Sequence, residues 1–227
     1  SGDKTENSLG ADYWIVKTDS LGIIQWQNTI GGNKGDELRS IQQTTDGGYI
    51  LGGYSNSSGI GDKSENSKGL NLEFDYWIVN TDSVGNILWE NTIGGYSKDE
   101  LYSIQQTNDG GYILGGFSGS YISGDKTENS LFTDYWIVKT DSIGNIQWQN
   151  TIGGSSAEEL RSIIQTADGG YLLGGNSMSN ISGDKTENSF GSYDYWIVKV
   201  DSMGAIQWQN TIGGSDNEYF YSIIQTT

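Results

Sequence analysis

The chain has 227 residues and a formal net charge of −17, from 29 acidic and 12 basic side chains. A surface this acidic repels phosphate backbones and anionic lipid headgroups, so we expect no nucleic-acid partner. The chain has no Cys and no His, which excludes disulfides, zinc–thiolate sites and the Ser-His-Asp and Cys-His catalytic systems within these residues. We expect no membrane-spanning segment, because no stretch approaches the roughly 18 apolar residues that a span needs.

One unit of about 60 residues recurs along the whole chain. The string DYWIV begins at four positions, 63, 59 and 60 residues apart, namely Asp12, Asp75, Asp134 and Asp194. Repetition at a nearly fixed period predicts an array of supersecondary units, each of which buries its apolar face against its neighbours.

The unit that starts at Asp36 begins with a predicted β-hairpin. Residues 38–44 alternate between apolar and polar side chains, as a half-buried strand does, and we name this strand a. Asp46-Gly47-Gly48 then predicts a tight turn, because Asp and Gly tolerate positive φ angles. Residues 49–54 form the predicted partner, strand b, whose Gly pair permits close packing.

The second half of the unit predicts another hairpin after a polar loop at residues 55–74. Residues 76–79 are strand c, residues 82–85 form a Gly turn, and residues 87–93 are strand d. Four antiparallel strands that meander at this period predict an all-β fold, a β-propeller of four-stranded antiparallel blades. A β-solenoid or an open stack of sheets is the alternative, although the coils of a solenoid are usually much shorter.

The hairpin of strands c and d carries a more specific signal. The string VNTDSVGNILW places an Asp, a turn Gly and a Trp at spacings similar to those in the tryptophan-docking repeats of quinoprotein-type propellers. The resemblance implies that the Trp of strand d packs against the neighbouring blade. The four Trp residues concerned are Trp26, Trp89, Trp148 and Trp208.

Taken whole, DYWIVKTDSxGxIQWQNTIGG followed by SIQQTxDGGYILGG resembles repeats in secreted and surface proteins of Bacteroidetes. Many of those proteins carry a carboxy-terminal sorting domain for type IX secretion, and most have no assigned activity. The resemblance implies an extracellular or cell-surface location. It does not imply a reaction.

We interpret residues 1–227 as one repeat array. The last unit reaches strand a and stops before a strand b, so we expect the native protein to continue and its blades to form part of a larger ring. No leader is visible at the amino terminus. The units span residues 1–35 (partial), 36–95, 99–154, 158–214 and 218–227 (partial).

The loop between strands b and c contains the motif GDK[TS]ENS in every unit. Its oxygen-bearing side chains, with the Asp that precedes YW, are numerous enough for Ca²⁺, which takes six to eight oxygen ligands. The alternative is a self-bonded polar loop, in which Asp and Asn accept hydrogen bonds from nearby backbone amides. The candidate ligands are Asp3, Glu6, Asn7 and Asp12; Asp62, Glu65, Asn66 and Asp75; Asp125, Glu128, Asn129 and Asp134; and Asp184, Glu187, Asn188 and Asp194.

A second set of acidic residues precedes strand a. In a propeller the b–c and d–a loops emerge on the same face, so these residues predict an acidic, ligand-binding rim there. Paired carboxylates also suggest a glycosidase, but one catalytic site needs one acid and one base, whereas every acid here has equivalents. The predicted rim consists of Asp36, Asp99, Glu158 and Glu218.

The sequence therefore predicts a non-catalytic binding or adhesion module for a protein or glycan, with Ca²⁺ as the one candidate cofactor. Apolar residues in the b–c insertions, at Tyr121-Ile122, Leu131-Phe132 and residues 70–72, would contact a partner. Two alternatives remain: a structural spacer in a long surface protein, and a hydrolase or lyase with catalytic residues partly outside these 227.

Overall fold

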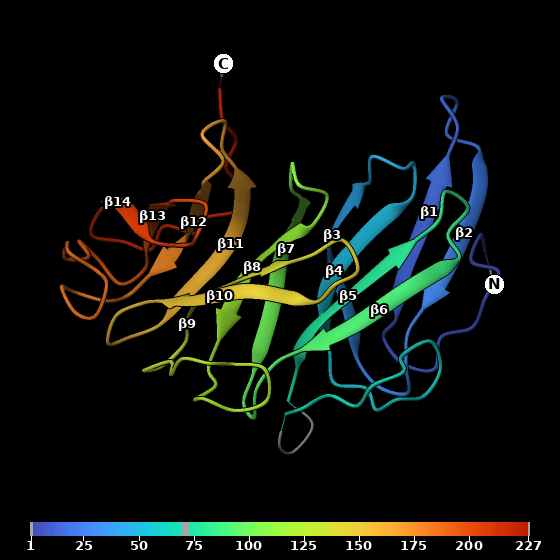
Figure 1. Ribbon diagram of the computed structural model, residues 1–227, viewed down its shortest axis with the longest axis horizontal. Coiled ribbons are helices and arrows are strands. Elements are labelled where there is room, and N and C mark those ends of the chain that lie inside the picture. The colour runs from blue at the N-terminus through green and yellow to red at the C-terminus, as the bar shows by residue number, and fades with distance from the viewer. Residues whose placement is uncertain (1, 70–72, 227) are drawn as a thin grey trace.

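The computed structural model describes residues 2–69 and 73–226, which form four antiparallel sheets (Figure 1). These residues contain strands and turns but no helix, and so none that is long and apolar enough to cross a membrane. The strands are β1 (Tyr13–Thr18) and β2 (Ile24–Ile30); β3 (Asp36–Gln43), β4 (Tyr49–Ser55), β5 (Asp75–Thr81) and β6 (Ile87–Ile93); β7 (Asp99–Gln106), β8 (Tyr112–Ser118), β9 (Asp134–Thr140) and β10 (Ile146–Ile152); and β11 (Glu158–Gln165), β12 (Tyr171–Ser177), β13 (Asp194–Val200) and β14 (Ile206–Ile212).

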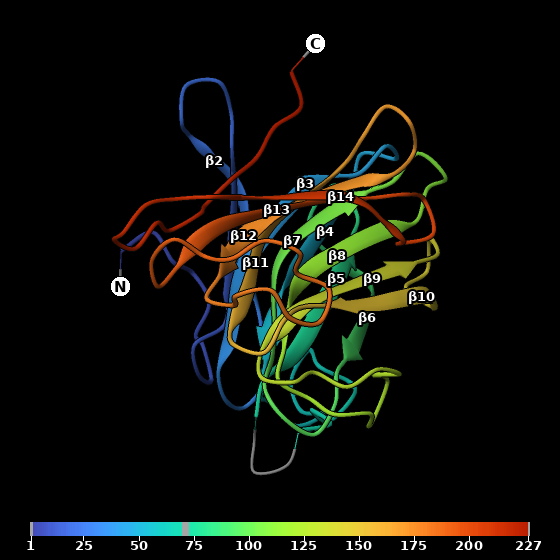
Figure 2. The same cartoon turned by 90° about the vertical axis from the view of Figure 1, so that its left-hand side faces the viewer.

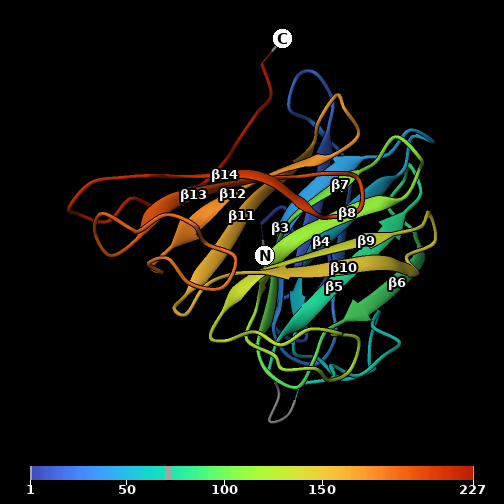
Figure 3. The same cartoon turned by 60° about the vertical axis from the view of Figure 1, so that its left-hand side comes forward.

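Each four-stranded sheet is one predicted blade. The strands pair in chain order, so that β3 to β6, β7 to β10 and β11 to β14 each run as strands a, b, c and d. The four-stranded sheets follow one another in chain order and pack in series, as Figures 2 and 3 show from two further sides. The all-β, propeller-like repeat fold that the sequence predicts is confirmed.

The turn between strands c and d is built by its Asp. In the β5–β6 turn, Oδ1 of Asp82 accepts hydrogen bonds from the backbone amides of Val84 and Asn86, both at 2.9 Å. Gly85 has a φ of 89°, a backbone conformation that side chains with a Cβ rarely adopt. The same arrangement recurs in every unit, which explains why the Asp and the Gly are repeated at this spacing.

Adjacent sheets are joined by aromatic side chains. Trp26 on β2 packs on Tyr49 of the next sheet with ring centroids 5.6 Å apart, and Trp89 packs on Tyr112 at 5.8 Å. Trp148 packs on Tyr171 at 5.9 Å, so the predicted docking of the strand-d Trp on the neighbouring blade is confirmed for these three. Trp208 on the last sheet is 49% exposed, and no aromatic ring packs on it in the described residues. The hydroxyl of Tyr76 on strand c donates to the backbone carbonyl of Trp136 in the following sheet, at 3.0 Å.

Strand-c tryptophans are predicted to be core residues. Trp77, Trp136 and Trp196 are fully buried, but Trp14 is 44% exposed. The difference arises because β1 pairs only with β2, whereas β5, β9 and β13 each have a strand b on their other edge.

Strands a of successive sheets contact one another directly. The side-chain oxygen Oε1 of Gln42 on β3 accepts a hydrogen bond from the backbone amide of Gln106 on β7, at 2.7 Å. Gln105 makes the equivalent 2.7 Å bond to the amide of Gln165 on β11. The strands a therefore line up side by side and bring their side chains together on one face.

Candidate binding site

A β-bulge interrupts each complete strand a at the same repeat position. In β3 the register passes from Leu38 opposite Gly53 to Ser40 opposite Gly52, which leaves Arg39 without a partner. Tyr102 in β7 and Arg161 in β11 are the equivalent extra residues. A bulge re-aims the side chain of the extra residue and is common beside functional sites.

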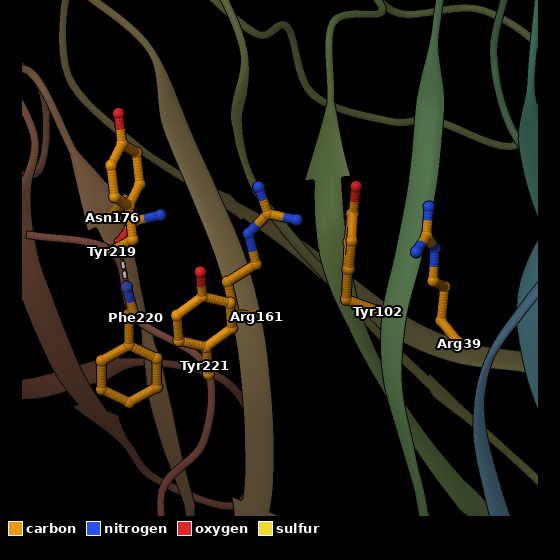
Figure 4. A pocket seen from close by; sticks show the side chains of 7 residues that line it. All are labelled: Arg39, Tyr102, Arg161, Asn176, Tyr219, Phe220 and Tyr221. Atoms are coloured by element: carbon orange, nitrogen blue, oxygen red, sulfur yellow. Dashed lines mark hydrogen bonds between the residues drawn. The ribbon is translucent and has the colours of Figure 1, made fainter.

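The three bulged residues form a row across adjacent sheets. The ring of Tyr102 lies between two guanidinium groups, with its centroid 5.3 Å from the Arg39 Cζ and 4.2 Å from the Arg161 Cζ. Cation–π attraction at these distances holds the row together. Figure 4 shows the three side chains side by side, with their polar ends pointing the same way.

Both arginines are paired with acidic side chains from their own strand. Arg39 donates to Glu37 Oε2 at 2.7 Å, and its guanidinium also lies 5.0 Å from the ring of Tyr54. Arg161 forms the same ion pair with Glu159. Each guanidinium therefore presents itself to solvent beside a carboxylate, with side chains about a quarter to two-fifths exposed.

The central tyrosine is held as a hydrogen-bond donor. The hydroxyl of Tyr102 donates to Glu100 Oε2 at 2.7 Å, while Lys98 lies 2.7 Å from the other oxygen of the same carboxylate. Burial, and then the bond to Glu100, raises the pKa of Tyr102, so the hydroxyl stays protonated. Across the row, two arginines and one lysine balance three glutamates, so the formal charge is zero.

A cleft of about 340 Å³ opens on this row. Its far wall is the segment after β14, where the amide of Phe220 donates to Oδ1 of Asn176 at 2.7 Å and its ring packs on Tyr195. This anchoring leaves the next residue, Tyr221, at the cleft with 83% of its surface exposed. We call the site the strand-a cleft; it is lined by Arg39, Tyr102, Arg161, Asn176, Tyr219, Phe220 and Tyr221.

The sequence analysis missed this cleft, although a signal was present. Arg39 and Arg161 are the only arginines in the chain, and both occupy one repeat position, where the other two units have Tyr102 and Tyr221. The acidic residues were predicted to form the site instead, because they recur from unit to unit. The bulge itself cannot be predicted from the alternation of apolar and polar residues along strand a.

The residues of the predicted acidic rim lie elsewhere and do not form an exposed surface. Asp36, Asp99 and Glu158 are buried, and Glu218 is half-buried. Their carboxylates accept hydrogen bonds from Gly-Gly amides; Asp99 Oδ2, for example, accepts from Gly95 at 2.6 Å. The prediction of a solvent-facing rim at these positions is corrected, because the carboxylates are used to fix the d–a connection.

The structure brings members of the two predicted acidic sets together. Asp75 on strand c lies beside Asp99 on strand a of the next sheet, and Asp134 lies beside Glu158 in the same arrangement. Oδ1 is buried without a hydrogen-bond partner in Asp75, Asp99 and Asp134. We call these neighbours the junction carboxyl pairs: Asp75 with Asp99, Asp134 with Glu158, and Asp194 with Glu218.

Burial raises the pKa of three carboxyl groups in the junction carboxyl pairs, those of Asp75, Asp99 and Asp134. Loss of solvation, and then the charge of Asp99, raises the pKa of Asp75 to about 7. Burial likewise raises the pKa of Asp134 to about 7 and that of Asp99 to about 6. The nearby ammonium of Lys126 is also buried, which lowers its pKa to about 8.

Three lysines of the GDK[TS]ENS loops are buried against strand c of their own sheets. Lys63, Lys126 and Lys185 lie over the rings of the strand-c tryptophans, with Nζ 5.1 to 5.6 Å from the ring centroids. Each ammonium donates to a Thr hydroxyl on strand d of the same sheet. The lysine of the motif is therefore a packing residue that ties the loop to strands c and d.

The other motif residues are bonded largely to the backbone. The first Asp of the motif, as at Asp125, accepts from a Gly amide of the preceding sheet. The Asn closes its own loop, as Asn129 does with the amide of Ile122 at 2.8 Å, and the Glu accepts from a strand-d amide, as Glu128 does from Thr151 at 2.6 Å. The predicted ligands bonded in these ways are Asp62, Asp125 and Asp184; Asn66, Asn129 and Asn188; and Glu6, Glu128 and Glu187.

The remaining predicted ligands fall into two groups. Asp3, Asn7 and Glu65 are exposed, and the backbone carbonyl of Asp3 accepts from the side chain of Gln27 at 2.5 Å. The carboxylates before YW accept amides of their own loops. These four are Asp12, Asp75, Asp134 and Asp194.

The described part of the chain contains no group of three acidic side chains placed to hold a metal ion. The observed bonds are those expected of a self-bonded polar loop. Calcium binding stays a prediction, and thermal unfolding in excess EDTA and then in millimolar Ca²⁺ tests it. A site that binds the native state alone raises the midpoint saturably.

Of the apolar b–c insertions, those in the third unit are exposed. Tyr121, Ile122, Leu131 and Phe132 are each more than 60% accessible to solvent. The predicted contact residues 70–72 lie outside the described residues.

Comparison with known proteins leaves the family open. No protein-family description matches the chain. The chain is 21% identical to the regulatory protein FlaEY of Caulobacter vibrioides over 186 residues, which is 79% of this chain but only 19% of that protein. A solved structure from Bacteroides caccae, a protein of unknown function, is similar at 11% identity with a TM-score of 0.41, covering 86% of this chain and 73% of the other.

Proposed function

We propose that the protein is a non-catalytic binding module whose ligand site is the strand-a cleft. One observation carries the proposal: both arginines of the chain lie at the bulged position of strand a, and Tyr102 lies between them. The neighbouring positions of strand a are nearly uniform between units. At the cleft, the variable position of strand a is accessible on three adjacent sheets together.

A binding role fits the cleft better than catalysis does. General acid–base chemistry needs a carboxyl group that is free to take or give a proton at the reacting atom. Each glutamate at the cleft already has a partner. Glu37 is paired with Arg39 and Glu159 with Arg161, while Glu100 binds Tyr102 and Lys98. No observation favours the hydrolase or lyase alternative.

An extracellular or cell-surface location is part of the proposal. It is supported by the resemblance of the repeat to those of secreted and surface proteins. Proteolysis of intact cells tests it: loss of the protein while a cytoplasmic marker survives supports the location, and equal protection of both contradicts it.

Equilibrium binding tests the function. We expect a ligand from a panel of oligosaccharides and peptides to bind the full chain and to lose affinity when Arg161 is changed to Ala. The variant Lys34→Ala, which removes a positive charge outside the cleft, is the matched control. Absence of binding across the panel contradicts the module and favours a structural spacer, for which the cleft has no role.

A further inference from the structure

We infer that the strand-a cleft takes a neutral saccharide, bound through paired donors and acceptors and stacked on its exposed tyrosines. The inference rests on the proposed binding function and names the ligand class. Three features of the cleft support it: its charge balance, the arrangement of its hydrogen-bonding groups, and the accessibility of its aromatic rings.

Charge balance argues against a charged ligand. The three cations of the row are matched by Glu37, Glu100 and Glu159, so neither sign of ligand gains a net attraction there. The whole chain carries −17, which opposes the approach of any anion. A charged ligand would also break an existing ion pair without receiving a free counter-charge.

The hydrogen-bonding groups lie in donor–acceptor pairs. The guanidinium of Arg39 offers further N–H groups beside the second oxygen of Glu37, and Arg161 does the same beside Glu159. A sugar hydroxyl both donates and accepts, so two adjacent hydroxyls satisfy such a pair. The amide of Asn176 on β12, across the ladder from Glu159, adds a donor at the cleft, because its oxygen already accepts from Phe220.

Aromatic faces supply the remaining contact. Tyr221 is 83% exposed and Tyr219 is 51% exposed, and both line the cleft. A pyranose ring presents an apolar C–H face that packs on an aromatic ring, while its edge stays polar. Tyrosine suits this use because it combines a rigid apolar surface with a polar tip.

The size of the cleft sets the length of saccharide. Its volume of about 340 Å³ lies at the small end of ligand cavities. The cleft therefore holds a short segment, a mono- or disaccharide unit within a longer chain. A short contact of this kind gives weak affinity, which several linked copies on one polymer would raise.

Titration calorimetry with defined probes tests the inference. The probes are neutral hexasaccharides of glucose, xylose, mannose and galactose, a uronic-acid hexasaccharide, and one acidic and one basic decapeptide. We expect at least one neutral hexasaccharide to bind, with an affinity that is unchanged between 0.05 and 0.5 M salt, since charge screening does not weaken neutral contacts. Tyr221→Ala is expected to weaken that binding by about tenfold or more.

Two further variants complete the design. Arg161→Lys keeps the charge but loses the planar pair of donors, and is expected to weaken binding as well. Tyr121→Ala removes another exposed tyrosine, one that lies on a b–c loop and does not line the cleft, and is expected to leave affinity unchanged. Circular dichroism and the unfolding midpoint confirm that each variant is folded.

The possible outcomes separate the binding function of the cleft from the class of ligand that it takes. Binding of the uronic-acid probe or a peptide that depends on Tyr221 and Arg161 keeps the binding module and overturns the neutral saccharide. Saccharide binding that none of the cleft variants affects overturns the cleft as its site. No binding by any probe overturns both.

Discussion

Two positions on strand a, three residues apart, have opposite characters. Asp99 opens β7, is fully buried, and has an acidic counterpart in every unit. Tyr102 is the bulged residue of the same strand, is partly exposed, and alternates with Arg between units. Positions that join one blade to the next are kept constant by packing, whereas a residue outside the ladder is free to differ and to face a ligand.

Gly116 lies opposite the bulge and also contacts the preceding sheet, and we expect its substitution to have the largest effect on stability. A Cβ at Gly116 would meet the backbone carbonyl of Glu100 and the hydroxyl of Tyr76. Because the carbonyl cannot move without distorting strand a, we expect Gly116→Ala to destabilise the fold by about 3 kcal/mol or more in urea unfolding. Gly119→Ala, where a Cβ meets only ordinary contacts, is the control. Equal stability of the two variants would contradict the close approach.

The junction carboxyl pairs predict an unusual pH dependence. The folded-state pKa values of Asp75, Asp134 and Asp99, about 7, 7 and 6, lie above the unfolded value of about 3.9. Between those limits the unfolded chain has lost protons that the native state keeps, so stability falls as pH rises from about 4 to about 7. We expect the unfolding midpoint to be several degrees lower at pH 7.5 than at pH 5.

The buried lysines reverse the trend at higher pH. Lys63 and Lys126 have folded-state pKa values of about 8, below their usual value of about 10.4. Between these values the unfolded chain holds the extra protons, so stability rises again with pH. A flat profile from pH 5 to 9 would contradict both effects.

Asp99→Asn isolates one junction. The amide keeps an acceptor for Gly95 and Ser120 and gains a donor toward Asp75. We expect its stability relative to the unsubstituted chain to increase from pH 5 to pH 8, because like-charge repulsion is removed. Asp216→Asn, an exposed substitution, is expected to show no such change.

Removing one tyrosine hydroxyl at the junction between sheets and one at the bulge compares the two regions through smaller changes in stability. Tyr76→Phe removes a buried hydrogen bond between blades, which we expect to cost about 0.5–1.5 kcal/mol of unfolding free energy. Tyr102→Phe removes a partly exposed bond to Glu100, and we expect a change within about 0.5 kcal/mol. Equal costs in denaturant titrations would mean that the bulge is as constrained as the junction.

The smallest effect on stability is expected at the bulge itself. Arg161→Tyr places there the residue that two other units carry at that position. The side chain lies outside the ladder, so we expect unfolding free energy to change by no more than about 0.5 kcal/mol. Saccharide binding in calorimetry is expected to be lost. A large loss of stability with unchanged binding would mean that the bulged position serves the fold and not the ligand.

The strands could be predicted because each rests on local signals that repeat. Alternation, the DGG and TDSxG turns and the strand-d Trp gave all four strands of a blade and the packing between blades. The burial of Asp99 was not predicted, because a polar residue at a loop is expected to be exposed. Only the fold brings Asp75 and the amide of Gly95 to its carboxylate. The cleft depends on a one-residue change of register, which leaves no mark on the hydrophobic pattern.

The bulge makes the molecule a natural starting point for changing specificity. A substitution at Arg39, Tyr102 or Arg161 alters a side chain that lies outside the hydrogen-bonded register of its strand. Duplication of a unit therefore supplies another position at which the cleft can be altered without changing strand pairing. Randomising these three codons together with that of Tyr221 would give a library of clefts that differ in charge and shape on one unchanged backbone.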